Sequence, residues 1–169
     1  MSYVPSHRDS SQEGLAQPDS LILIPSVVNS SYVASGKIGL QTPTVWFGSW
    51  TPSITSDVIT LPSGYYYFIE SAQAVYWGSG GHLSYMEAQV YDETNSSYIG
   101  QLGRCAYHDY GFQADNTRDG AAFALIDCVS SGVDISVRLK TNSGLLSFNY
   151  IDSSNRAGYG RTIIWRLDP

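Results

Sequence analysis

Residues 132–141 have the sequence GVDISVRLKT, in which apolar and polar side chains alternate without interruption. The odd positions from 133 to 139 are apolar and the even positions from 134 to 140 are polar. Successive side chains of a strand point to opposite faces, so this pattern predicts a strand with one face in a core and the other in water. A β-sheet is therefore the expected unit of the fold.

Comparable short runs recur from residue 44 onward and are separated by clusters of Gly, Pro, Asn and Ser, which favour turns. The runs expected to form strands are 44–50, 57–61, 64–75, 83–92, 98–105, 121–128, 132–141, 145–151 and 160–167. This spacing predicts an all-β fold, an antiparallel β-sandwich or jelly roll of about 8–9 strands. By composition, residues 85–92 and 120–131 also fit short helices, and that alternative stays open.

An extended N-terminal arm, residues 1–43, is expected to precede a β-sandwich domain at 44–169. Residues 1–20 are polar and lack strand or helix periodicity, whereas 21–33 are apolar but interrupted by Pro25. Proline cannot donate to a sheet ladder, so this run is not expected to be a central strand. It packs either on the edge of its own domain or on another subunit.

The charge content excludes several classes of partner. Charged residues make up only 14% of the chain, against about 25% in ordinary soluble proteins, and the net charge is -6. The nine basic residues are scattered, which argues against nucleic acid as a partner. The apolar runs are too short to span a membrane. The polar N-terminus lacks the features of a signal peptide, so we expect a chain made in the cytoplasm without one.

No residue pattern points to catalysis, and we predict that the protein is not an enzyme. His82 and His108 have no nucleophile context, since serines are abundant and no Gly-x-Ser-x-Gly elbow is present. The acidic loop 115–120 lacks the alternating order of calcium ligands and contains Arg118. We therefore expect no metal and no cofactor.

The two cysteines, Cys105 and Cys128, are too few for a disulfide scaffold and are not spaced as a zinc site. We interpret them as buried reduced thiols. A single cross-strand disulfide is the alternative.

Aromatic residues, 13% of the chain, divide into three expected groups. Residues 65–68 (YYYF) place aromatic rings on both faces of one strand, so both faces need to be covered. Trp46 and Trp165 lie in apolar runs and are expected in the core. Other aromatic or amphipathic residues in Gly-rich surroundings are candidate surface contacts, with core packing as the alternative. These contact residues are Trp77, His82, Tyr107 and Tyr110.

Two segments carry a family resemblance. Residues 57–69 (DVITLPSGYYYFI) combine a strand, a Leu-Pro-x-Gly turn and a Tyr-rich strand, and residues 157–167 (AGYGRTIIWRL) form a Gly-Tyr-containing final strand. This pattern resembles C1q/TNF-like jelly rolls and small bacteriophage virion proteins built on such trimeric sandwiches. With the strands between them, the resemblance covers residues 44–169.

The resemblance implies a homotrimer and a structural role in the virion. A strand that is aromatic on both faces fits a subunit interface, for which the candidates are Tyr65, Tyr66, Tyr67 and Phe68. The arm is too short for a fibre shaft, which favours a capsid decoration (cement) protein on the capsid surface that binds the major capsid protein. The expected capsid-binding residues of the arm are Leu21, Ile22, Leu23, Ile24, Val27 and Val28. The alternative is a tail-fibre or receptor-binding tip that recognises a host glycan or protein through the contact residues.

Overall fold

The computed structural model describes residues 18–26, 31–32, 36–77, 86–104, 106–109, 121–141, 148–149 and 160–169. The strands are β1 (Pro18–Pro25), β2 (Ser31–Tyr32), β3 (Thr44–Phe47), β4 (Ser53–Thr55), β5 (Val58–Leu61), β6 (Tyr66–Ala72), β7 (Ala74–Trp77), β8 (Met86–Asp92), β9 (Ser97–Arg104), β10 (Ala106–Asp109), β11 (Ala122–Asp127), β12 (Val133–Thr141), β13 (Phe148–Asn149) and β14 (Arg161–Leu167). Within these residues no helix occurs, which confirms the all-β prediction. The helix alternative for the segments that form β8 and β11 is wrong.

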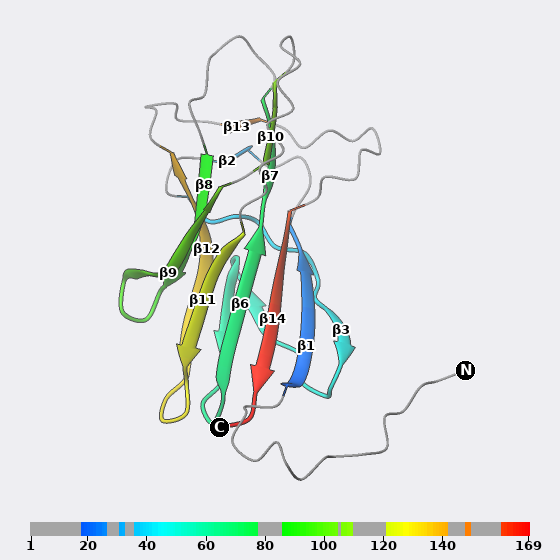
Figure 1. Cartoon of the computed structure of the whole chain (residues 1–169), viewed down its shortest axis with the longest axis vertical. Coiled ribbons are helices and arrows are strands. Elements are labelled where there is room, and N and C mark those ends of the chain that lie inside the picture. The colour runs from blue at the N-terminus through cyan, green and yellow to red at the C-terminus, as the bar shows by residue number, and fades with distance from the viewer. Residues whose placement is uncertain are drawn as a thin grey trace, which may run out of the picture.

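Ten strands form one curled antiparallel sheet in the order β3-β1-β14-β6-β11-β9-β8-β12-β5-β4 (Figure 1). We call the five strands from β3 to β11 the first layer and the five from β9 to β4 the second layer. The two layers are joined where Phe123 of β11 pairs with Gln101 of β9. The two ends of the sheet, β3 and β4, follow one another in the chain, so the sheet curls back on itself. The result is an antiparallel β-sandwich of the jelly-roll type, as the sequence predicts.

The core lies between the two layers and takes one face of each strand. The first layer contributes Ile22, Ile24, Tyr67, Ile69, Ala124, Ile126 and Ile164, and the second contributes Ile59, Leu61, Val90 and Ile135. In β12, Ile135, Val137 and Leu139 face the core and are almost fully buried, whereas Arg138 and Lys140 on the other side are partly exposed; Ser136 on that side is buried as well. In each of these strands, the residues at every second position therefore face the core.

The predicted division at residue 43 is wrong, because β1 is an integral strand of the first layer. It pairs with β14 over most of its length and with β3 on its other side. Ile22 and Ile24 are fully buried in the core, and Ile38 and Leu40 are also buried. Proline is tolerated at position 25 because the pairing of β1 with β3 ends at Leu23, two residues earlier. Residues 1–17 lie outside the described residues.

Strands β7 and β10 pair with each other outside the ten-stranded sheet and form a ribbon that extends beyond the sandwich (Figure 1). β7 follows β6 after Gln73, and β10 follows β9 after residue 105. Both parent strands flank β11 and run in the same direction, so their continuations pair in parallel, with Ala74 opposite Ala106 and Trp77 opposite Asp109. This parallel pairing differs from the purely antiparallel arrangement that the sequence predicts. We call β7 and β10 the ribbon.

Buried polar side chains hold the chain where the ribbon leaves the sandwich. The Ser26 hydroxyl donates to Gln73 Oε1 at 2.8 Å, and Gln73 Nε2 donates to the Ser71 oxygen at 2.8 Å. Ser71 and Thr162 share a further hydrogen bond of 3.1 Å. Buried polar groups are costly unless paired, and these pairs satisfy one another. The network therefore ties β6 to β14 and to the residue that follows β1 at this end of the core.

Candidate functional site

One row of side chains crosses the outer side of the first layer and is apolar on every strand. Leu21 of β1 lies opposite Trp165 of β14, and Trp165 lies opposite Phe68 of β6. Phe68 in turn lies opposite Leu125 of β11, whose side chain is 69% exposed. The residues next to them in each strand face the core, so this row points away from it.

Strand β3 extends the row by a β-bulge. Val45 pairs with Ile22, but the next register pair is Phe47 with Leu21, so two residues of β3 face one residue of β1. Val45 packs against the core, whereas Trp46 is 57% and Phe47 44% exposed. The bulge therefore turns Phe47 to the same outer side as Trp46, and both aromatic side chains extend the exposed row. Trp46, which the sequence places in the core because apolar residues flank it, is not there, because Val45 takes the core side of β3 and the next residue, Trp46, points outward.

Aromatic contacts join the middle of this row to a second outward row, which lies two residues away along each strand. The Phe68 ring lies 5.3 Å from that of Trp165 and stacks on Phe123 at 5.9 Å, centroid to centroid. Phe123 belongs to the second row, and so do Leu23 and Ile163, which lie opposite each other. We call these outward residues the apolar face; they are Leu21, Leu23, Trp46, Phe47, Phe68, Phe123, Leu125, Ile163 and Trp165. Trp165, also predicted in the core, is partly buried on this outer side.

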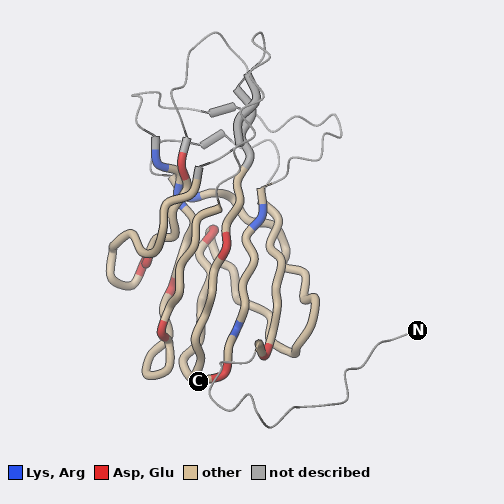
Figure 2. The backbone as a smooth tube through the Cα atoms, viewed as in Figure 1, with Lys and Arg blue, Asp and Glu red and all other residues tan. Residues whose placement is uncertain are grey.

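The outer side of the second layer is polar and provides a contrast. Arg138 lies 3.6 Å from the centroid of the Tyr91 ring, and Lys140 lies 4.2 Å from that of Tyr98. Lys140 Nζ also donates to Gln89 Oε1 at 3.0 Å. Charged groups on this side are paired or stacked, as on a surface that faces water. Figure 2 shows that few of the described residues are charged and that charged residues are sparse on the first-layer strands.

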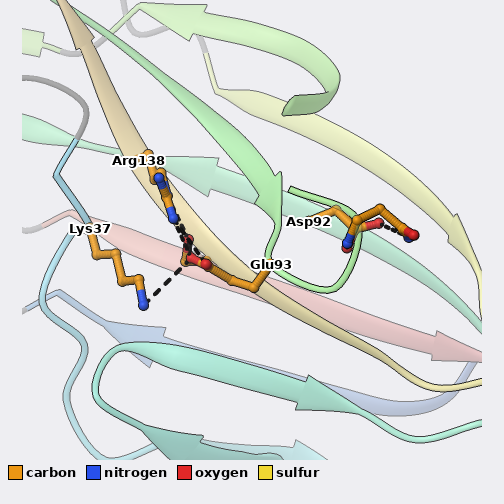
Figure 3. Close-up of polar contacts among 6 residues, drawn as sticks. Lys37, Asp92, Glu93 and Arg138 are labelled. Atoms are coloured by element: carbon orange, nitrogen blue, oxygen red, sulfur yellow. Dashed lines mark hydrogen bonds and ion pairs between the residues drawn. The ribbon is translucent and has the colours of Figure 1, made fainter. Parts of the chain in front are cut away.

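An ion cluster around Glu93 fixes the turn between β8 and β9 to β12. Arg138 Nη2 donates to both carboxylate oxygens of Glu93 at 2.8 and 2.9 Å, and Lys37 Nζ lies 3.6 Å away (Figure 3). The buried Ser136 hydroxyl donates to the same carboxylate at 2.6 Å. Burial alone would raise the pKa of Glu93, but these hydrogen bonds and the two positive charges outweigh it and hold that pKa below its usual value. Each charged group of the cluster has a partner within the chain, so the cluster has a structural role.

A second ion pair closes the opposite end of the core. Arg166 Nε donates to Asp19 Oδ2 at 2.6 Å, and its guanidinium lies 4.2 Å from the Tyr65 ring and 5.3 Å from the Trp50 ring. Hydrogen bonds from Arg166 and then Ser20 lower the pKa of Asp19. This pair clasps the start of β1 to β14.

The predicted trimer-interface residues are split by the sheet. Tyr67 is fully buried, burial raises its pKa, and its hydroxyl donates to the carbonyl of Pro62 at 3.1 Å. Tyr67 therefore cannot contact another subunit, and that part of the prediction is wrong. Tyr65 packs beside Arg166 at the end of the core. Phe68 lies on the apolar face, and Tyr66 lies on the same side of β6.

The predicted capsid-binding residues divide in the same way. Ile22 and Ile24 are in the core and are unavailable to a partner, so their assignment to a binding arm is wrong. Leu21 and Leu23 face outward on the apolar face. Val27 and Val28 lie outside the described residues.

Two of the four predicted surface-contact residues lie on the ribbon. Trp77 is the last residue of β7, and Tyr107 of β10 pairs with Val75 beside it. Residues 32 positions apart in sequence are thereby paired at one end of the molecule (Figure 1). His82 and Tyr110 lie outside the described residues.

Cys128 is a free thiol, buried next to the end of β11. Burial raises the pKa of this thiol to about 11, so it is protonated and unreactive at neutral pH. Cys105, its possible disulfide partner, lies outside the described residues.

In the described part of the chain, no group of three or more His, Cys, Asp or Glu side chains is arranged to hold a metal ion. The same residues include no helix with the length and hydropathy needed to cross a membrane. No protein-family model and no curated protein matches the chain.

Proposed function

We propose that this protein is a structural subunit that forms a homotrimer through the apolar face. The observation that supports self-association is the row that runs from Phe47 to Leu125 across five strands. Monomeric proteins rarely expose a continuous apolar patch of more than a few hundred Å². Burying a large apolar side chain contributes about 1.5–3 kcal/mol, so several such residues together stabilise an oligomer.

The character of the two outer surfaces supports a second copy of this chain as the partner. Interfaces between identical subunits are richer in apolar area and poorer in charge than other surfaces. The outer side of the first layer has this character, whereas that of the second layer carries Arg138, Lys140 and Glu93 in paired arrangements. The trimeric state is taken from the resemblance to C1q/TNF-like jelly rolls.

Within the virion we propose that the trimer is a capsid decoration protein that binds the major capsid protein and stabilises the shell. Support comes from the resemblance of residues 57–69 and 157–167 to phage virion jelly rolls. Because Ile22 and Ile24 are used in the core, contact with the shell falls to residues outside it. Val27, Val28 and residues 1–17 are the segments to test for that contact.

The apolar face is tested by Leu125→Asp. Its carboxylate would be buried without a partner in the interface, which costs several kcal/mol, so we expect at least about 100-fold weaker self-association. Size-exclusion chromatography with light scattering and sedimentation equilibrium measure the change. Val129→Asp is the matched control, because Val129 is also an exposed apolar residue but lies in the turn after β11. A wild-type monomer, or a Leu125→Asp trimer of wild-type strength, contradicts the proposed assembly.

A receptor-binding tip is the second candidate, and the ribbon is the observation that favours it. Recognition sites commonly occupy segments that project from a rigid scaffold. The ribbon carries Trp77 and Tyr107 beyond the sandwich, at the end opposite the Asp19–Arg166 clasp.

One experiment separates the two roles. We expect the wild-type protein and the Trp77→Ala variant to sediment equally with phage heads purified without this protein, because the decoration role does not use the ribbon. Both proteins are also mixed with host cells, and bound protein is measured. Binding to cells that is lost in Trp77→Ala, together with no binding to heads, would establish the tip role instead.

A further inference from the structure

One acidic residue lies within the apolar face. Glu70 of β6 sits on the outer side of the first layer, between Ile163 of β14 and Phe123 of β11. Phe68, two residues earlier on the same strand, is on the same side. Glu70 is partly buried among these apolar neighbours and forms no ion pair with any other described residue.

A partner that covers the apolar face must therefore bring a positive charge to Glu70. Burying a carboxylate without a partner costs several kcal/mol, which would offset much of the gain from covering Phe68 and Phe123. An arginine or lysine placed opposite Glu70 removes that penalty through a charge-assisted hydrogen bond. The chemistry required of the partner is thus an apolar surface with one cation in it.

A second copy of this chain carries such a cation. The first-layer strands contain two basic residues, Arg161 and Arg166. Arg166 is on the core side and is paired with Asp19. Arg161 is exposed and lies on the outer side of β14, opposite Ala72 of β6. It is therefore the basic residue that the first layer of a neighbouring subunit can offer.

The positions of the two residues also restrict the symmetry. Arg161 is level with Ala72, only two residues along β6 from Glu70, which is about 7 Å along the strand. A rotation axis parallel to the strands leaves the height of each residue along the strands unchanged in every subunit. Arg161 of one subunit then lies at nearly the same height as Glu70 of its neighbour. A twofold axis perpendicular to the strands reverses the strand direction in the neighbouring subunit. Arg161 would then lie near the opposite end of the neighbour's first layer, where Asp127 of β11 is exposed.

We propose that Arg161 of one subunit pairs with Glu70 of its neighbour across the apolar face, about a rotation axis parallel to the strands. This inference rests on the proposed self-association and adds to it the residue pair that sets the orientation of the subunits. Heterologous contacts of this kind repeat around a closed ring, so each interface contains one such pair.

Charge exchange tests the pair. Arg161→Glu and Glu70→Arg each place like charges at every interface, and we expect each to weaken self-association about 10- to 100-fold. The double variant restores opposite charges and should recover wild-type association to within about threefold. Sedimentation equilibrium over a dilution series measures the association constants. Thermal unfolding, below the concentration at which each protein associates, measures the stability of the isolated subunit.

Asp127→Arg provides the matched control, because it makes the same charge change as Glu70→Arg at the other end of the layer. We expect it to leave association unchanged. Weakening by Asp127→Arg but not by Glu70→Arg would overturn the parallel axis. Single variants that lower only the stability of the isolated subunit would show a pair within one chain and overturn the inference. Unchanged association in both single variants would also overturn it while leaving the apolar face intact, whereas a monomeric wild type would remove the proposed function itself.

Discussion

Deletion of residues 1–33 is expected to abolish cooperative folding, whereas deletion of residues 1–17 is expected to preserve it. The longer deletion removes β1, and with it two fully buried core residues, Ile22 and Ile24. Truncating one such side chain typically costs about 2–5 kcal/mol, and the whole stability of a domain is about 5–15 kcal/mol. Loss of the pairing with both β14 and β3 adds to this cost.

Circular dichroism and urea unfolding of both truncated chains measure the effect. The shorter deletion is the control, since the strand pairs and core contacts that the structure describes begin at Pro18. A chain without residues 1–33 that still unfolds cooperatively near the wild-type midpoint would show that β1 is dispensable. That result would restore the interpretation of residues 21–33 as an arm.

Substitution of Gly100 by alanine is expected to destabilise the fold by about 2–5 kcal/mol, the sum of a positive φ and a backbone clash. Gly100 has φ +71°, and a Cβ atom there would lie 2.0 Å from the carbonyl oxygen of Phe123 and 2.7 Å from Ala124. The register between β8 and β9 shifts beside it, between Ile99 and Gly103, and at the same place the other edge of β9 pairs with β11 through Gln101. A side chain at Gly100 therefore pushes the two layers apart where they are joined.

Gly64→Ala is the matched substitution. Gly64 also has a positive φ, +97°, but a Cβ atom there would meet nothing within 4 Å. Only the backbone strain applies, about 1–2 kcal/mol. Urea unfolding of both variants separates the strain from the clash. Equal losses of stability would mean that β9 accommodates the extra atom by moving away from β11.

The sequence predicts most of the second layer because its strands have one wet face. In β12 the core side is apolar and the outer side is polar, so the period of two is plain in GVDISVRLKT. Strands β5 and β8 also fall within the predicted runs, and β9 begins one residue before its predicted run. β4 has only three residues between turns and gives too short a signal to recognise.

In the first layer, β3, β6, β11 and β14 also fall within predicted runs. Strand β1 and the buried side of each strand are harder to predict, because both faces of this layer are apolar. In β1, Ile22 and Ile24 face the core while Leu21 and Leu23 face outward, so LILI has no visible period. With Pro25 close behind, that run suggests an arm rather than a strand. The bulge that turns Phe47 to the same side as Trp46 depends on how β3 pairs with β1, and pairing over this distance leaves no local mark in the sequence. The contribution of Phe68 to an exposed apolar surface was predictable, because an aromatic run on both faces of a strand needs a second cover.

The position of β14 has a consequence for the order of events during synthesis. β14 lies between β1 and β6 in the first layer, yet Asp19 and Arg166, which clasp its end, are 147 residues apart in the chain. Strands so distant pair only after both have left the ribosome, and such non-local pairing is slow. Until β14 has been made, Trp165 is missing from between Leu21 and Phe68. Under the proposed self-association, a chain still on the ribosome lacks the central tryptophan of the association surface, and we expect such chains to associate less with one another than finished chains do.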